Sequence, residues 1–215
     1  NANPTAGSLR AAIKAANNAG GPYLIRFAIP GSCPRAIVLA APMLDIVGDV
    51  TIDGRTQPGW SANSDYGQFD ATLCLFINGT GSTPYAFRVP ASAVNARLSV
   101  HGFIFAGFSD AAIRIERGAN HRISGNQFGA VAFTASNHDA VRITGNAGSA
   151  FIGGYDDPGS VNLIAGTADA GVYLDNVAGG STVVNNIIGF QPDGIFAGTN
   201  PVGIFVFNSP NNQLA

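Results

Sequence analysis

Charged residues are scarce in this chain. They make up 11% of its 215 residues, less than half of the usual share of about 25%, and Lys14 is the only lysine. The formal net charge is −2, which gives no basis for a general attraction to nucleic acid or to an anionic membrane. No apolar run reaches transmembrane length, because Gly, Asn, Pro or a charge interrupts each one. We therefore expect neither a nucleic-acid partner nor insertion into a membrane.

Cysteine is scarce as well. Cys33 and Cys74 are the only two, and they lie 41 positions apart. A disulfide between them would close a long loop and would suit an exported protein, whereas two buried thiols are an equally open reading. The first residues do not form a basic-then-apolar leader, so we expect that any export signal has been removed or precedes Asn1.

Repetition is what the sequence has in abundance. Similar four-residue phrases recur in the order small, apolar, variable, apolar, which is the period of two expected of a strand with one buried face. Their first apolar residues follow one another at spacings of 28, 31 and 32 residues. Such a repeat predicts a solenoid, in which each coil buries its apolar face only by stacking on its neighbours. The phrases are Ala112–Ile115, Ala140–Ile143, Gly171–Leu174 and Gly203–Val206, with a fainter copy at Ala86–Val89.

The start of the chain predicts one helix. Ser8 can cap it, apolar residues follow at helical spacing through residues 9–16, and Gly20-Gly21 stops it. A short amphipathic helix needs a surface to cover, so we interpret it as a cap on the first coil. The sequence thus predicts one domain over residues 1–215, with a capping segment at 1–22, irregular coils at 23–98 and regular coils at 99–215.

Two segments depart from the regular coils. Gln57–Gln68 is a polar excursion with Trp60 and Tyr66, and we expect a loop that stands off the stack and carries function. The sequence breaks off in the middle of a repeat, which leads us to expect a fragment, or an end that another chain covers. An open strand edge there would also permit end-to-end self-association.

Several segments resemble bacterial exported right-handed parallel β-helix proteins. The matching stretches are Gly7–Ile13, Phe27–Gly31, Val50–Gly59, Ser124–Gly129 and Asn185–Gly189, of which Thr51–Gly59 is the most specific. The resemblance spans nearly the whole chain. It implies a pectate-lyase-like superhelix of three parallel sheets, export, and usually a place in a larger secreted or cell-surface protein. It implies no single activity, because fold alone does not give function.

Stacking of the repeated phrases predicts a candidate ligand-binding column. If neighbouring coils lie about 4.8 Å apart in register, the outward residues form a column of three guanidinium groups followed by two aromatic rings. Such a column would suit an acidic polysaccharide, with arginines holding carboxylates and rings contacting sugars. The alternative is that Asp110, Glu116 and Asp139 pair with the arginines inside the protein. The column consists of Arg88, Arg114, Arg142, Tyr173 and Phe205.

Catalytic candidates are few. Hydrolysis of a polysaccharide needs two or three converging carboxylates, and Asp156-Asp157 is the only adjacent pair of acids that we single out. Its Gly and Pro neighbours indicate a turn instead. His101-Gly102 and Arg114-Ile115 resemble fragments of polygalacturonase motifs, but they precede the acid pair and the third carboxylate motif is missing.

Candidate metal ligands are also weak. Asp49 and Asp53 face the same side of a predicted strand about 13 Å apart, so they could share a Ca²⁺ ion only with help from a neighbouring coil. Asp110, Asp139 and Asp169 fall at equivalent turns, where they could bind Ca²⁺ or simply cap the turn. His101, His121 and His138 show no metal-ligand spacing. We interpret Asn126, Asn146 and Asn186 as turn residues or as an internal asparagine ladder.

These observations favour an exported or cell-surface β-helix module with a structural, adhesive or glycan-binding role. Its partner would be a polysaccharide or another surface protein, and no cofactor is required beyond the Ca²⁺ already considered. The alternative is a polysaccharide lyase or glycoside hydrolase acting on an acidic polysaccharide. An enzyme would need carboxylates, and for a lyase an arginine or lysine base, converging in a groove.

Overall fold

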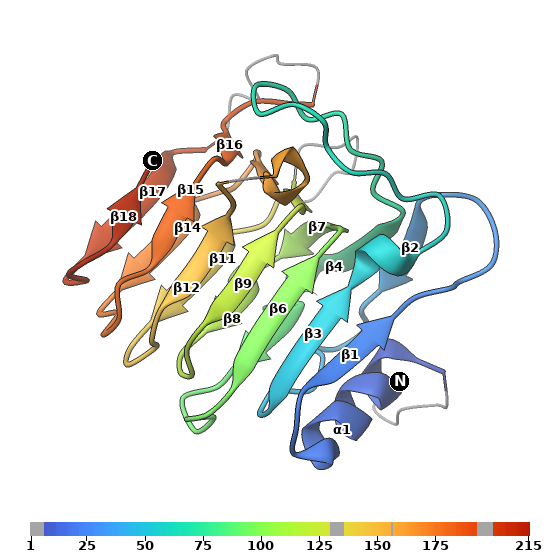
Figure 1. Ribbon diagram of the computed structural model, residues 1–215, viewed down its shortest axis with the longest axis horizontal. Coiled ribbons are helices and arrows are strands. Elements are labelled where there is room, and N and C mark those ends of the chain that lie inside the picture. The colour runs from blue at the N-terminus through green and yellow to red at the C-terminus, as the bar shows by residue number, and fades with distance from the viewer. Residues whose placement is uncertain (1–6, 130–135, 156, 193–199) are drawn as a thin grey trace.

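The chain forms a parallel β-solenoid, as the repeat predicts. The computed structural model describes residues 7–129, 136–155, 157–192 and 200–215. Its strands cycle in order through three sheets, and from β3 onward successive coils contribute a strand to each sheet in turn (Figure 1). All the strand pairs within the sheets are parallel. The expected fold class is therefore confirmed.

We number the sheets by the order in which the chain enters them. Sheet 1 contains β1 (Tyr23–Arg26), β3 (Asp49–Asp53), β6 (Arg97–His101), β9 (His121–Ser124), β12 (Ala150–Gly153), β15 (Thr182–Val184) and β18 (Gln213–Leu214). Sheet 2 contains β2 (Arg35–Val38), β4 (Leu75–Thr83), β7 (Phe103–Phe108), β10 (Gln127–Phe128), β13 (Leu163–Ile164) and β16 (Ile187–Ile188). Sheet 3 contains β5 (Phe87–Val89), β8 (Ala111–Ile115), β11 (Asp139–Thr144), β14 (Ala170–Asp175) and β17 (Val202–Phe207).

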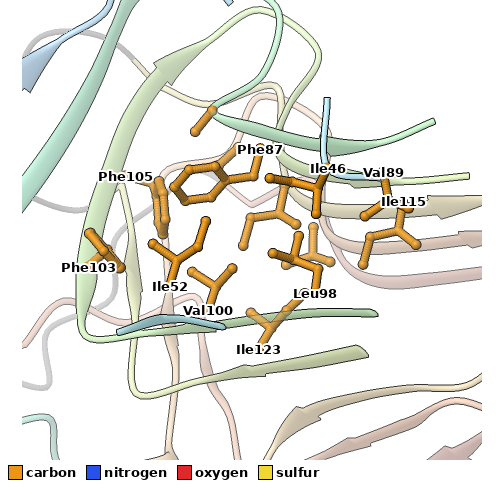
Figure 2. Close-up of a cluster of buried hydrophobic side chains, with 14 of the residues drawn as sticks. Ile46, Ile52, Phe87, Val89, Leu98, Val100, Phe103, Phe105, Ile115 and Ile123 are labelled. Carbon is orange, nitrogen blue, oxygen red and sulfur yellow. The ribbon is translucent and has the colours of Figure 1, made fainter. Parts of the chain in front are cut away.

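Alternation along each strand builds the interior. In β8, for example, Ile113 and Ile115 are fully buried while Arg114 between them reaches the outer surface. Phenylalanines from sheets 2 and 3 meet inside the stack, where the ring of Phe105 lies edge-to-face with that of Phe87, with centroids 6.0 Å apart (Figure 2). Within sheet 2, the rings of Phe105 and Phe128 are stacked with centroids 5.2 Å apart. Because this core runs through successive coils, each coil depends on its neighbours for burial.

The predicted helix caps the first coil. Helix α1 (Leu9–Ala19) begins after Ser8, whose hydroxyl accepts a hydrogen bond from the Ala11 amide, and it ends at Gly20 in the left-handed conformation. Its buried residues Leu9, Ile13 and Ala16 join the main core. In Figure 1 the helix lies beside β1 at the N-terminal end of the stack. The expected cap is therefore present.

Asparagines stabilise one corner of the solenoid from within. The side-chain amide of Asn126 donates to the carbonyl of Val100 and to Oδ1 of Asn162, and the Asn162 amide donates to Oδ1 of Asn186. The prediction of an internal ladder is confirmed for Asn126 and Asn186. Asn146 instead fits the alternative reading, since it is exposed in a turn, and the ladder also contains Asn162, which the sequence analysis missed.

The predicted loop Gln57–Gln68 does not stand off the stack as expected, since its Trp60 packs against the solenoid; it is part of a longer segment, residues 57–74. It folds back over the outer face of sheet 2, where Phe69 and Leu73 pack against outward side chains of β4, β7 and β13 in a second apolar cluster. Figure 1 shows this cyan-to-teal segment running from the N-terminal coils toward the C-terminal ones. The reason is that sheet 2 has apolar residues on both faces, such as Ile104 between Phe103 and Phe105, and the outer ones need a cover.

A disulfide anchors the base of this segment. Cys33 and Cys74 are bonded, with their Cα atoms 4.7 Å apart, which resolves the alternative left open by the sequence. Gly59 packs directly against this bridge, because a Cβ atom there would lie 3.1 Å from Sγ of Cys74. A structural disulfide indicates an oxidising, extracytoplasmic location. No helix within the described ranges is long and apolar enough to cross a membrane.

Candidate functional site

The predicted column of outward residues is present on sheet 3. Arg88 pairs with Arg114, Arg114 with Arg142, Arg142 with Tyr173, and Tyr173 with Phe205 in the registers of successive strands. The register is thus confirmed, and the inward partners Phe87, Ile113, Val141 and Val172 are fully buried as expected. A binding role for the column is a separate matter and depends on what its side chains contact.

The arginines of the column pair with carboxylates of the protein itself. Arg114 donates from Nε to Oε1 of Glu116 at 2.7 Å and from its terminal nitrogen to Asp110. Arg88 donates to Oε2 of Glu116 at 2.9 Å. Burial would raise the pKa of Glu116, but its hydrogen bonds from both guanidinium groups hold it below the ordinary value. This is the internal pairing that the sequence offered as the alternative to ligand binding.

The next arginine continues the network. Nε of Arg142 donates to Oδ2 of the fully buried Asp139 at 2.6 Å and lies 3.6 Å from Oδ1 of Asp110. Arg88 also approaches Asp45 at 3.6 Å. Three guanidinium groups therefore share four carboxylates, and an acidic ligand would have to displace these partners to be held by the arginines.

The aromatic part of the column is also occupied. The guanidinium carbon of Arg142 lies 4.2 Å from the centre of the Tyr173 ring, and the Tyr173 and Phe205 rings are stacked 4.6 Å apart with an interplanar angle of 20°. Both faces of Tyr173 are thus covered by neighbours in the column, leaving its edge toward solvent. A sugar ring cannot stack on Tyr173 without opening this arrangement.

His101 lies in a register that places three catalytic residue types side by side. Asp53, His101 and Ser124 occupy equivalent positions in three adjacent strands of sheet 1, and Nδ1 of His101 lies 2.8 Å from Oγ of Ser124. Burial, with the nearby Arg55, lowers the pKa of His101 to about 4. However, Ser124 is only 3% exposed and both oxygens of Asp53 accept from Arg55. Asp53, His101 and Ser124 therefore form hydrogen bonds within the protein, and Ser124 is too buried to reach a substrate.

Asp49, Asp53 and Asp157 do not converge on one site in the described part of the chain. Asp157 caps the short helix η2 (Pro158–Ser160), where it accepts from the Gly159 amide, and Asp156 lies outside the described residues. Asp49 and Asp53 lie on one face of β3, as expected. Burial alone would raise the pKa of Asp53, but hydrogen bonds from Arg55 hold it below its usual value. The only possible metal-ligand cluster among the described residues contains neither Asp49 nor Asp53.

A cavity that sequence reasoning did not predict lies where the 57–74 segment meets the β16 coil. It has a volume of about 440 Å³, within the usual range for small-molecule sites, and it opens to solvent. Two aromatic rings at its edge are substantially exposed, Tyr66 by 43% and Phe190 by 45%. Every described lining residue is uncharged, and the principal ones are Tyr66, Gln68, Phe69, Asn186, Phe190 and Gln191.

The polar groups of this cavity divide into fixed and available ones. The Tyr66 hydroxyl donates to the carbonyl of Tyr155 at 3.0 Å, which fixes the ring on the neighbouring coil, and the Asn186 amide belongs to the internal ladder. The amides of Gln68 and Gln191 make no hydrogen bond to any described residue, so each can donate to and accept from a ligand. Tyr66 was the available sequence signal, as an aromatic residue in a polar loop.

Comparisons of the chain with protein-family models, with curated proteins and with solved structures found no match. The fold and the geometry of its surfaces therefore carry the functional argument.

Proposed function

We propose that this protein is a secreted or cell-surface β-helix module that binds a neutral glycan in the cavity between the 57–74 segment and the β16 coil. The observation that carries the proposal is the combination of exposed aromatic rings with two amides that have no hydrogen-bond partner among the described residues, around a cavity whose described lining is uncharged. Aromatic rings offer apolar area to the C–H face of a sugar, and amides suit hydroxyl groups because they both donate and accept. The extracytoplasmic disulfide is consistent with this role.

Charge favours this cavity over the sheet 3 column as the glycan site. The arginines of the column already hold Asp110, Glu116 and Asp139, so releasing them for an acidic sugar would leave these carboxylates without partners. The cavity needs no such exchange, since the Gln68 and Gln191 amides are unused within the described chain. A neutral sugar is therefore preferred to a uronic acid.

The test is a screen of the protein against arrayed neutral and acidic oligosaccharides, followed by calorimetry on the best ligand. We expect saturable binding of a neutral oligosaccharide that Tyr66→Ala and Phe190→Ala each weaken by about tenfold. Tyr66→Phe, which keeps the ring and loses the hydroxyl, should bind more tightly than Tyr66→Ala. Tyr23→Ala is the matched control, because Tyr23 is 37% exposed at the other end of the stack.

Two results would contradict the proposal. Binding only to an acidic polysaccharide, lost in Arg114→Ala and Arg142→Ala, would move the site to the sheet 3 column. Release of unsaturated products or new reducing ends during incubation would instead identify a polysaccharide lyase or glycoside hydrolase. Both should be followed with Ca²⁺ and again with a chelator, since a lyase of this kind would depend on a bound cation.

A further inference from the structure

One cluster of ionisable side chains lies beside the arginine network of sheet 3 and shares Asp139 with it. Extending the register in which Val141 pairs with Val172 places His138 beside Asp169 in the next coil, and the Asp169 amide donates to the His138 carbonyl. Asp139, the residue after His138, begins β11. Ligand atoms of His138, Asp139 and Asp169 all lie within 4.8 Å of one another. The spacing in the sequence predicted that Asp139 and Asp169 occupy equivalent turn positions, but the residue equivalent to Asp169 is His138.

Two of the three side chains lack partners where partners are expected. Nδ1 of His138 is buried and has no hydrogen-bond partner in the described structure, although Oδ1 of Asp139 lies 3.5 Å away. The carboxylate of Asp169, which is half-buried, makes no hydrogen bond or ion pair with any described residue. A buried ring nitrogen without a partner is unusual, and a bound ion or an ordered water is its ordinary explanation.

Asp139 is held in place for such an interaction. Its side chain is fully buried, with Oδ2 accepting from Nε of Arg142 at 2.6 Å and Oδ1 accepting from the Ala170 amide at 2.9 Å. A carboxylate oxygen has a second lone pair, so Oδ1 can still bind a cation. Outer contacts of this kind fix the orientation of a metal ligand.

The local charge also favours a cation. Asp110, Asp139 and Asp169 bring three negative charges to this corner, where Arg114 and Arg142 pair with Asp110 and Asp139. The charge left over lies on Asp169, which has no cationic partner among the described residues. A divalent ion would neutralise it and would satisfy Nδ1 of His138 in the same step.

We propose that Nδ1 of His138, Oδ1 of Asp139 and the carboxylate of Asp169 bind a divalent transition-metal ion of the Zn²⁺ class. Bonds of about 2.0–2.2 Å in a tetrahedral site place ligand atoms roughly 3.4 Å apart, so His138 and Asp139 are already close to the required spacing. The Asp169 carboxylate lies within 4.8 Å of both and supplies the third ligand. One imidazole and two carboxylates suit Zn²⁺ better than Ca²⁺, which takes six to eight oxygen ligands. The ion would link two neighbouring coils.

The test is calorimetric titration of the chelator-treated, dialysed full chain with Zn²⁺, together with the visible absorption of added Co²⁺. We expect one ion per chain, a Co²⁺ spectrum typical of tetrahedral coordination, and a loss of affinity of about tenfold or more in His138→Ala and in Asp169→Asn. Both changed residues are partly exposed, so these variants should fold. Asp175→Asn is the matched control, since it removes a carboxylate from the opposite end of β14.

Three results would overturn the proposal. They are absence of saturable Zn²⁺ binding by the folded chain, Zn²⁺ binding that is unchanged in both His138→Ala and Asp169→Asn, and Ca²⁺ binding that is tighter than Zn²⁺ binding at this site. None of these depends on a glycan, so failure here is separable from failure of the proposed function.

Discussion

The outer faces of sheets 2 and 3 differ in the side chains that they present and in what covers them. Both belong to strands whose inner residues fill one continuous core, and both must present their outer residues to something. Sheet 3 carries Arg114 and Arg142 outward and surrounds them with carboxylates. Sheet 2 carries apolar residues such as Ile104 and Leu163 outward and is covered by the 57–74 segment. A charged face can thus remain open to solvent, whereas an apolar face requires a second layer and forms a cavity where that layer ends.

The largest expected effect comes from removing packing under the cover of sheet 2. Leu163→Ala should lower the free energy of unfolding by about 2–5 kcal/mol, because Leu163 is completely buried outside the main core and its loss leaves a cavity. Urea denaturation measures this directly. Val94→Ala, at a position 58% exposed, is the control and should change stability by less than about 0.5 kcal/mol. An equally small change for Leu163→Ala would mean that the 57–74 segment is not packed on sheet 2.

The pH dependence of stability should distinguish the buried neutral histidines from the paired carboxylates. Burial lowers the pKa of His101 and of His121 to about 4, against an ordinary value of 6.5. The free energy of unfolding is therefore not reduced by these histidines above pH 6.5. It falls as the pH drops from 6.5 toward 4, because the unfolded chain binds protons that the folded chain does not. The loss is up to about 3 kcal/mol per histidine. Thermal unfolding from pH 7 to pH 4 measures it.

The paired carboxylates of sheet 3 should behave differently in the same experiment. The pKa of Glu116 is below its ordinary value, so its contribution is complete above about pH 4.5 and is lost only at lower pH. A His121→Gln variant should therefore flatten the slope between pH 6.5 and pH 4, whereas Glu116→Gln should not. A slope that is equal in the two variants would place the near-neutral titration elsewhere.

The smallest expected effect is on the charged face. Arg114→Met should cost about 1–2 kcal/mol, because it leaves Asp110 and Glu116 without their shared partner while both stay partly open to water. The loss of unfolding free energy caused by Arg114→Met should be smaller in 1 M salt, where the screening length is about 3 Å. The Leu163→Ala cost should not shrink in this way. A loss for Arg114→Met that is large and independent of salt would show that this face is held by packing rather than by charge.

The register of the solenoid was predictable because repeated phrases carry it. The spacing of Ile113, Val141, Val172 and Ile204 indicated which residues stack, and the structure pairs them in that order. The helical cap was predictable from its own signals, Ser8 and Gly20. The asparagine ladder was only partly predictable. Asn162 was missed, and the sequence left open which asparagines lie in turns, since an asparagine in a turn and one in a ladder look alike in sequence.

The side-chain contacts between coils, unlike the register of the strands, were not predictable. Whether the sheet 3 arginines face solvent or pair internally stayed open at the level of sequence, because pairing depends on rotamers and on residues one coil away. Three features depend on residues that are about 30 to 120 positions apart in the sequence. They are the path of the 57–74 segment over sheet 2, the cavity at Tyr66 and Phe190, and the contact of His138 with Asp169. Two expectations remain predictions. One is that the column from Arg88 to Phe205 binds a ligand, and the other is that the chain associates end to end.

By itself, the sequence determined the period of the coils, the inward and outward faces of the strands, and the position of the helical cap. These follow from short-range patterns that repeat, because a period of two and a coil of constant length leave few alternatives. Tertiary structure alone decided which polar groups are satisfied and which are left over. That outcome depends on which side chains stacking brings within a few ångströms, and no local pattern contains this information.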